Sequence, residues 1–178
     1  MRSECLGDAY RSGLSAGTFD LVHMRFVAST AGNPDELLKE AARLARPGGI
    51  VALQEPDGST LNCYPPHPAW DRLKAVLLGV FKGVGADLQL AMRLYHLVHQ
   101  AGFRDVEYRT VLLGVRSIDP IVDYLPSTVE SLRASAVRLA LIDDRDLDAA
   151  LHNCRQHLCK PGTAFTMYTV AQVWGRTR

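Results

Sequence analysis

The order of apolar and polar residues predicts alternating strands and helices in the first third of the chain. Residues 19–25, FDLVHMR, form a short apolar run behind the turn-like SAGT and favour a strand. Asn33 can then cap a helix, Pro34 suits its first position, and leucine and alanine follow at helical spacing until RPGG ends the pattern. The unbroken run IVAL at 50–53 indicates a parallel strand buried on both faces. Together these segments predict a right-handed βαβ unit.

The rest of the chain is predicted to be mostly helical, with strands near its end. Three prolines make 61–68 a loop. Residues 106–112 alternate in polarity like a strand, and GTAFTMYTVAQVWGR closes the chain as one long strand. Two late strands joined by a helical insert are expected to pair antiparallel at one sheet edge. A strand stub is expected at residues 4–6. Apolar periodicity predicts four helices, over 69–84, 86–100, 127–141 and 144–158.

Length and composition fit one α/β domain over residues 1–178. The chain has 178 residues, of which 47% are hydrophobic, and this is enough for a substantial core. Acidic and basic residues are interleaved and the net charge is +1, so no basic face predicts nucleic-acid binding. No apolar run is long enough to span a bilayer, and MRSECLGDAY lacks the apolar region of a secretory signal. The four cysteines form no C-x-x-C pair, so we expect reduced thiols in a cytoplasmic protein.

A cluster near the C-terminus has the residue types of a metal site. It consists of His152, Cys154, His157 and Cys159. At about 100° per residue, His152 and Cys159 lie on one side of a helix, while Cys154 and His157 lie roughly opposite. Four ligands cannot converge on one ion from a single straight helix, so no metal site is predicted. Cys154 shares an apolar stripe with Leu147 and is expected in the core.

Three stretches, by their order and spacing, resemble class I S-adenosylmethionine-dependent methyltransferases. They are GDAYRSGLSAGTFDLVHMRFV, NPDELLKEAARLARPGGIVALQEPD and LVHQAGFRDVEY. The likeness is closest to small-molecule methyltransferases with a ubiquinone/menaquinone-biosynthesis-like domain. In that family GDA follows the third strand, FDLV is the fourth, RPGG precedes the fifth, AGF precedes the sixth, and a strand like FTMYTVAQVWGR is the seventh. The resemblance implies a Rossmann-like sheet with residues 115–160 as a helical insertion, and S-adenosylmethionine as cofactor.

The chain departs from that family at its beginning. The family's glycine-rich motif follows its first strand, and an acidic residue after its second strand holds the cofactor ribose. Only six residues precede GDA here, and no G-x-G-x-G occurs before it. We therefore expect an N-terminally truncated methyltransferase domain that a missing N-terminal segment or a separate chain completes. Cofactor binding by these residues alone is expected to be weak or absent.

The resemblance implies three cofactor contacts. Asp8 matches the position whose carboxylate accepts a hydrogen bond from the adenine amino group, and Ala9 matches the neighbour whose backbone amide reaches an adenine ring nitrogen. Arg25 matches the position after the fourth strand that contacts the cofactor. The alternatives are an ordinary Gly-Asp turn for Asp8 and, for Arg25, a surface side chain or an ion pair with Glu55.

Candidate bases follow the strands, because ligands of open α/β sheets bind beyond the carboxyl ends of parallel strands. Methyl transfer needs a general base only when the nucleophile carries a proton, and His23, Glu55 and His67 are the candidates. Each of the first two can instead be structural. The stretch CYPPHPAW places Tyr64 and Trp70 beside His67 as an aromatic lid that suits a planar or apolar acceptor. The alternative for Trp70 is the core side of the next helix.

Three functions are weighed. The leading hypothesis is S-adenosylmethionine-dependent methyl transfer to a small-molecule acceptor, through the resemblance. The alternative is a non-catalytic methyltransferase-like fragment that acts as an interaction or dimerisation module, because a sheet without its central strands exposes an edge at 19–24. A nicotinamide-dependent Rossmann enzyme is the weakest hypothesis, because it also requires a glycine-rich first loop. A homodimer and a small-molecule acceptor are thus the partners that the sequence favours.

Overall fold

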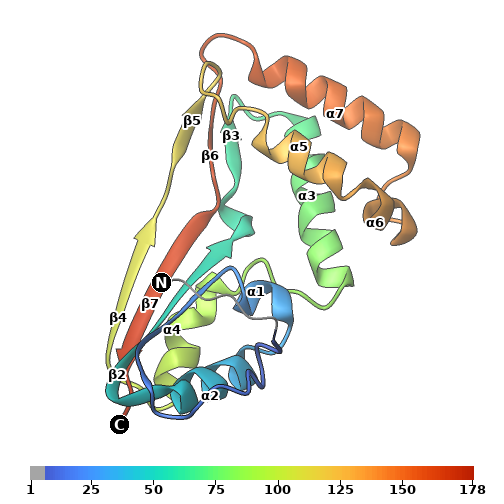
Figure 1. Cartoon of the computed structure of the whole chain (residues 1–178). Coiled ribbons are helices and arrows are strands. Elements are labelled where there is room, and N and C mark those ends of the chain that lie inside the picture. Colours follow the sequence, from blue (N-terminus) through green and yellow to red (C-terminus); the bar gives the residue numbers. More distant parts are fainter. Residues whose placement is uncertain (1–6) are drawn as a thin grey trace.

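The computed structural model describes residues 7–178, which form two β-sheets (Figure 1). The larger sheet has the strand order β1-β2-β7-β4. β1 and β2 are parallel, whereas β7 runs antiparallel to both β2 and β4. The strand stub expected at 4–6 lies outside the described residues. The strands of the larger sheet are β1 (Phe19–Arg25), β2 (Ala45–Asp57), β4 (Arg104–Val111) and β7 (Thr169–Arg176).

The predicted strand–helix–strand unit is confirmed. A short helix, α1 (Ala28–Ala31), and a longer one, α2 (Pro34–Leu44), connect β1 to β2. The Asn33 side chain caps α2 by accepting a hydrogen bond from the Glu36 amide at 3.3 Å. A proline occupies the first turn of α2, where its missing N–H removes no helical hydrogen bond.

β2 is longer than the apolar run at 50–53 predicts. It begins at Ala45, opposite Phe19 of β1, and the register is irregular before the regular ladder starts. Gly49 permits this course, because a Cβ at this position would lie 2.8 Å from the Arg46 carbonyl oxygen. The RPGG stretch therefore belongs to the strand and ends the helix without forming a separate loop.

One face of the larger sheet is covered by α2 and α4 (Ala91–Gln100) (Figure 1). Val51 and Leu53 of β2 point into this core and are almost completely buried. Ile50 and Ala52, which alternate with them, point to the other face and are only half-buried. The expected burial on both faces is therefore wrong for the described residues, since both helices pack on the same face.

The smaller sheet has the order β3-β6-β5 and continues the larger one (Figure 1). Its strands are β3 (Asn62–Tyr64), β5 (Gly114–Arg116) and β6 (Ala164–Thr166), which pair antiparallel. A short 3₁₀ helix, η1 (Gly58–Thr60), leads from β2 into β3. The expected antiparallel pairing of late strands is confirmed twice, by β4 with β7 and by β5 with β6. The prediction of a loop over 61–68 is corrected, because β3 lies in it.

The C-terminal strand, predicted as one, is divided between the two sheets. The Met167 amide donates to the Leu113 carbonyl at 2.9 Å, whereas the Thr169 amide donates to the Thr60 hydroxyl at 2.7 Å. The strand changes its partners between these two residues, from β3 and β5 to β2 and β4. The pattern of polar and apolar residues cannot reveal this break, because it alternates in the same way in β6 and in β7.

Four helices pack on the smaller sheet and form a helical layer with it. They are α3 (Pro68–Gly83), α5 (Tyr124–Ser131), α6 (Arg133–Arg138) and α7 (Asp144–Leu158). The last three lie between β5 and β6 in the chain, within the segment 115–160 expected as a helical insertion. The helix predicted over 127–141 is two helices that meet at Leu132. The helix predicted over 86–100 begins only at Ala91, because the Asp87 amide is held by the Ser29 carbonyl at 2.8 Å.

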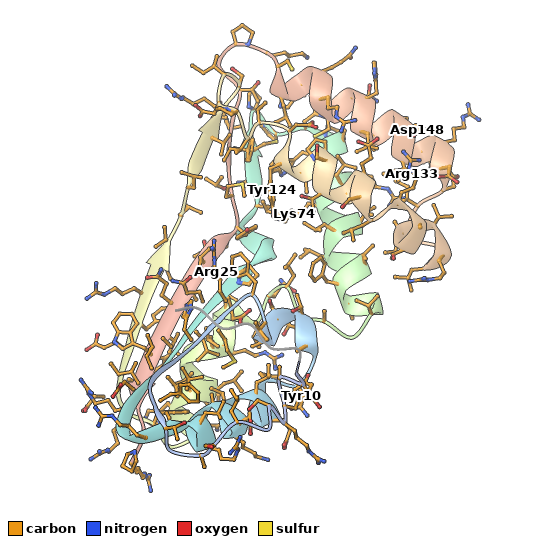
Figure 2. The ribbon with its side chains drawn as sticks, in the orientation of Figure 1. Tyr10, Arg25, Lys74, Tyr124, Arg133 and Asp148 are labelled. Carbon is orange, nitrogen blue, oxygen red and sulfur yellow. The ribbon has the colours of Figure 1, made fainter. Side chains whose placement is uncertain are left out.

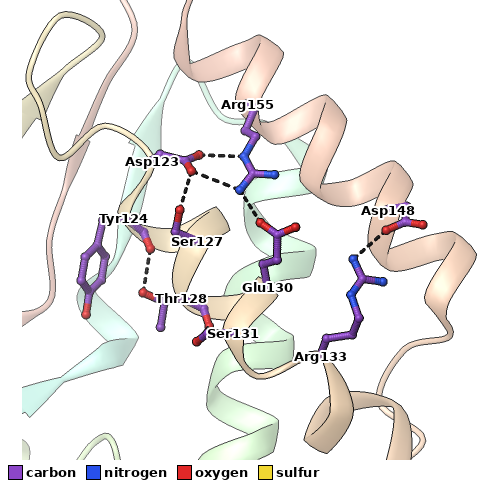
Figure 3. A network of polar contacts seen from close by, with 9 residues as sticks. All are labelled: Asp123, Tyr124, Ser127, Thr128, Glu130, Ser131, Arg133, Asp148 and Arg155. Atoms are coloured by element: carbon purple, nitrogen blue, oxygen red, sulfur yellow. Dashed lines mark hydrogen bonds and ion pairs between the residues drawn. The ribbon is translucent and has the colours of Figure 1, made fainter.

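Charged side chains join α5 and α7 on the outside of this layer (Figure 3). The Arg155 guanidinium donates to both carboxylate oxygens of Asp123, at 2.9 and 3.1 Å, and to Glu130 at 2.7 Å. Arg133 of α6 donates to Asp148 of α7 at 2.6 Å. Burial opposes the charge of Asp123, but the hydrogen bonds from Arg155 and Ser127 outweigh it and lower the pKa of Asp123. No helix in the described part of the chain is long and apolar enough to cross a membrane.

Candidate functional site

The carboxyl ends of β1 and β2 meet at one edge of the sheet, where the chain turns into α1 and η1. Glu55, near the end of β2, is fully buried, and its two carboxylate oxygens accept hydrogen bonds from the Ala28 and Ser29 amides at 2.9 and 3.0 Å. These amides begin α1 and have no partner within the helix. Glu55 therefore holds the first turn of α1 against the sheet, which is the structural role that the sequence left open for it.

An aromatic cluster lies where β1, the β6–β7 junction and α5 approach one another. Phe26 follows β1 in a left-handed conformation with φ of 56°, and its ring meets Tyr168 edge-on at a centroid distance of 5.7 Å. Tyr168 meets Tyr124 in the same way at 5.8 Å. Burial and the neighbouring Tyr168 raise the pKa of Tyr124. The sequence does not point to this aromatic cluster (Phe26, Tyr124 and Tyr168), because tertiary contacts alone join its three segments.

Arg25, an expected cofactor contact, lies at the rim of this cluster (Figure 2). Its side chain is exposed, and its guanidinium carbon lies 5.0 Å from the centre of the Phe26 ring. No ion pair joins Arg25 to Glu55 among the described residues, so that alternative is not observed. The cation and the aromatic ring therefore share the edge of the sheet where ligands of this architecture bind.

A lysine beside the end of β2 has a structural function. Lys74 of α3 donates to the carbonyl oxygens of Ser59 and Leu61 at 2.6 and 2.7 Å (Figure 2 labels it). Asp57, which is also buried, accepts hydrogen bonds from the Ser59 amide and hydroxyl at 2.9 and 2.6 Å. These bonds fix η1 and the start of the helical layer at the edge of the larger sheet.

The segment that carries Asp8 and Ala9 is exposed and approaches α1. One carboxylate oxygen of Asp8 accepts a hydrogen bond from the Tyr10 amide at 2.8 Å, as in the ordinary turn that the sequence allowed. The other oxygen accepts none from the described residues. The Tyr10 hydroxyl donates to the Ala31 carbonyl at the end of α1. Asp8 and Ala9 thus keep a carboxylate oxygen and a backbone amide for a ligand, on a turn tied to α1.

The same segment is anchored to α2 through Glu40. Its carboxylate accepts hydrogen bonds from the Ser12 amide and hydroxyl at 3.0 and 2.6 Å. Arg43, one turn further along the helix, donates to Glu40 at 2.7 Å and to the Leu14 carbonyl at 2.9 Å. Hydrogen bonds from Arg43 and Ser12 lower the pKa of Glu40 to about 2. The position of the Asp8 turn is therefore determined by α1 and α2 together.

The structure does not bring the three candidate bases together. His23 is exposed on β1, opposite Ala52, on the face that α2 and α4 leave open. Glu55 is enclosed beneath α1. His67 lies in the helical layer, where its ring nitrogen accepts a hydrogen bond from the Ala69 amide at 3.2 Å and caps α3. Their catalytic roles stay predictions.

His67 also stacks on a second histidine. Its ring lies 4.4 Å from that of His157 at the end of α7, and His157 hydrogen-bonds the Pro65 carbonyl at 2.8 Å. Burial and the neighbouring His157 lower the pKa of His67 from its ordinary value of 6.5. The stacked pair joins the start of α3 to the end of α7, as a structural contact within the helical layer.

The proposed aromatic lid takes a different form in the structure. Trp70 is completely buried against Phe165, at a centroid distance of 4.9 Å, so it belongs to the core of the helical layer. Tyr64 is 74% exposed at the end of β3. Cys154 lies in the same core as expected, and burial raises the pKa of its thiol to about 12. No three histidine, cysteine or acidic side chains converge on a metal position within residues 7–178.

The larger sheet and its helices form a Rossmann-like α/β domain, in which β1 and β2 end at the same edge. Residues 7–108, more than half of the chain, match the methyltransferase domain family. The chain therefore belongs to that family of methyltransferases, whose cofactor is S-adenosylmethionine. The described residues fit the adenine end of this cofactor, because Asp8 offers a carboxylate acceptor and Ala9 an exposed backbone amide.

Comparison with known proteins gives one curated relative and several similar structures. The secondary metabolism regulator laeA of Coprinopsis cinerea is 29% identical over 118 residues, which cover 59% of this chain. The chain spans only 29% of the length of that relative. The YcgJ protein of Bacillus subtilis has a TM-score of 0.53 at 13% identity, covering 97% of this chain and 69% of its own.

Two further solved structures are similar to the chain. A methyltransferase candidate from Bacillus halodurans has a TM-score of 0.53 at 16% identity, covering 96% of this chain and 69% of its own. Phosphoethanolamine N-methyltransferase 2 of Haemonchus contortus, solved with S-adenosyl-L-methionine, has a TM-score of 0.48 at 14% identity. The match covers 96% of this chain and 36% of the Haemonchus chain. At such low identities, the likeness of the two Bacillus structures shows the fold alone.

Proposed function

We propose that this chain transfers a methyl group from S-adenosylmethionine to a small-molecule acceptor, as one part of a methyltransferase pocket. The observation that carries the proposal is the edge where β1 and β2 end. There, Arg25 stands beside Phe26 and the aromatic cluster, within a chain of the methyltransferase domain family. The sulfonium of the cofactor supplies an activated methyl group, so the protein's task is mainly to position the acceptor and exclude water.

The adenine end of the cofactor would be held by the segment that precedes β1. Asp8 would accept the adenine amino group through the carboxylate oxygen that its own turn leaves open, and the Ala9 amide would donate to a ring nitrogen. Arg25, at the end of β1, would contact the cofactor from the neighbouring strand. The anchors to α1 and α2 support this assignment, because they keep the Asp8 turn beside α1, which follows the carboxyl end of β1.

The aromatic cluster supports an acceptor that is planar or apolar. Phe26 comes from the sheet and Tyr124 from the helical layer, so the cluster bridges the two parts of the chain. Edge-to-face rings present both apolar surface and hydroxyl groups, which suits an aromatic ring carrying a polar substituent. Such an acceptor needs a general base only if its nucleophilic atom carries a proton, and His23 and His67 are the candidates that do not hold α1.

Ligand-observed NMR with S-adenosylmethionine tests the cofactor part of this proposal. We expect weak binding by the 178 residues alone, seen as saturation transfer to the adenine protons, and loss of that transfer in Asp8→Ala and Arg25→Ala. Arg46→Ala is the matched control, because Arg46 is exposed and pairs with Asp20 on the surface. No transfer with the unchanged chain, or equal loss in the control, would contradict the assignment. Micromolar affinity in calorimetry would contradict weak binding.

A second candidate is a non-catalytic interaction module. Its supporting observation is β1, which pairs with β2 on one side and with no other strand among the described residues. The matched relative from Coprinopsis cinerea is called a regulator, and this name is compatible with such a function. Saturation transfer that depends on Asp8 favours the enzyme, whereas complexes that require the β1 edge favour the module.

A further inference from the structure

β4 and β5 form one long outer edge that spans both sheets. Over the described residues, β4 pairs only with β7, and β5 pairs only with β6. Figure 1 shows the two strands following each other along the same side of the molecule. The N–H and C=O groups on the outside of such an edge are available to another strand. Large apolar side chains along it are also exposed, at 47% for Tyr108, 51% for Val111 and 54% for Leu112.

Two charged side chains, Glu107 and Arg109, flank the centre of this edge. Glu107 and Arg109 lie opposite Trp174 and Gln172 of β7, so both point to the open face of the larger sheet. Both are exposed, and neither has an ion-pair partner among the residues that the structure describes. The guanidinium of Arg109 lies 5.3 Å from the ring centre of Trp174, which keeps it beside the sheet.

This arrangement of charges is self-complementary. If a second β4 pairs antiparallel about a two-fold axis at Tyr108, Glu107 lies directly opposite the partner's Arg109, and Arg109 lies opposite the partner's Glu107. Residues directly opposite each other in an antiparallel pair point to the same face, so both ion pairs form on the open face. Two identical contacts related by the axis are the mark of an isologous interface. A one-residue shift of the register would separate these charges.

The other face of the edge contributes an aromatic patch. Tyr108 points toward α4, where its ring lies 6.0 Å from that of Tyr95, and Tyr95 lies 6.3 Å from His99. Tyr95 is 46% exposed although it sits over the sheet edge. The same two-fold axis would bring this patch against its copy, adding apolar contact to the strand pairing. Strand pairing and an aromatic contact on one face together resemble the composition of stable interfaces.

We propose that the chain forms a symmetric dimer through the outer edge of β4, centred on Tyr108. The regular ladder of β4 with β7 extends from Glu107 to Val111, and the register is irregular before it, where Asp105 is left-handed with φ of 51°. The occupant of the edge is a second copy, since the charges of Glu107 and Arg109 are complementary to those of the same stretch read in reverse. This interface lies at the opposite end of the strand order from β1, so it leaves the carboxyl ends of β1 and β2 accessible.

Analytical ultracentrifugation of the full chain with charge-reversal variants tests the dimer. We expect a dimer whose dissociation constant rises about tenfold or more in Glu107→Arg and in Arg109→Glu, because each places like charges opposite each other twice. The double variant Glu107→Arg/Arg109→Glu should restore the dimer. Far-UV circular dichroism of each variant establishes that it is folded, and restoration in the double variant cannot come from unfolding.

Leu21→Arg on β1 is the matched control, because Leu21 is 55% exposed on the other edge of the same sheet. The dimer should persist in this variant. A monomeric unchanged chain, single charge reversals without effect, a double variant that stays monomeric, or loss of the dimer in Leu21→Arg would each overturn the proposal.

Discussion

The carboxylate of Glu55, at the end of β2, accepts the backbone amide of Ala28, at the start of α1, at 2.9 Å. The same carboxylate also accepts a hydrogen bond from the Ser29 amide. Glu55 therefore caps α1, although α1 comes before β2 in the chain. The contact spans 27 residues and closes the βαβ unit at its ligand edge. A residue expected as a base thus determines where α1 lies.

Replacing Glu55 should therefore destabilise the fold. We expect Glu55→Ala to lower the free energy of unfolding by about 3 kcal/mol, because two buried amides lose their acceptors. Glu55→Gln keeps one acceptor oxygen and should cost about half as much. Urea unfolding followed by circular dichroism gives both values. Glu36→Ala, which removes an exposed pair with Lys39, is the control and should change the stability by less than about 1 kcal/mol. Equal effects of Glu55→Ala and the control would contradict the capping role.

His67 should make the stability of the helical layer depend on pH. Its pKa is lowered in the folded state, so the unfolded chain binds the proton first as pH falls through 6.5. Stability should be fully present above this pH and decrease below it, until the folded histidine is also protonated. The groups that act on His67 are His157, Lys160 and Asp71.

His67→Asn isolates this effect, because asparagine can cap α3 but does not titrate. At pH about 8, the native chain and the variant should have nearly equal free energies of unfolding. At pH about 5, the free energy of unfolding of the variant should be the larger one. His152→Asn, at an exposed position, is the control and should leave the dependence of stability on pH unchanged. A parallel profile for His67→Asn would show that His67 does not contribute.

The ion pairs of Arg155 should couple α5 to α7. A double-mutant cycle with Arg155→Met and Asp123→Asn should give a coupling free energy of about 1 kcal/mol, because the pair is bidentate but partly exposed. The cycle for the exposed pair of Lys39 and Glu36 is the comparison, and its coupling should be smaller. A coupling for Arg155 no larger than this would mean that the network adds no measurable stability.

The cysteines should differ in reactivity in the folded protein. Cys63 and Cys154 are buried, and burial raises the pKa of both thiols, whereas Cys159 is exposed. In a Cys5→Ser background, a thiol reagent should label Cys159 rapidly, and should label Cys63 and Cys154 only after urea is added. Cys159→Ser should remove the rapid phase. Fast labelling of two or three thiols in native buffer would contradict the packing of the helical layer.

Much of the fold followed from local patterns, and the site followed only in part. The cap at Asn33 and the strand at 19–25 depend on neighbouring residues, so they were predicted correctly. The division of the last strand at Met167 depends on partners that lie far along the chain, and periodicity does not record them. The resemblance pointed to Arg25, whose place at the end of β1 is observed, but nothing local pointed to Tyr124 and Tyr168.

The sequence by itself determined many of the elements, because capping, proline and apolar spacing act over a few residues. It also determined the family, since the order of GDA, FDLV, RPGG and AGF is a property of the chain alone. The tertiary structure decided which polar groups are enclosed. Glu55 is a helix cap and Trp70 lies in a core. Among the described residues, the outer edge of β4 pairs with no strand, and its charges have no ion-pair partner. Burial and pairing arise from contacts between segments that lie far apart in the chain, and local sequence patterns do not record those contacts.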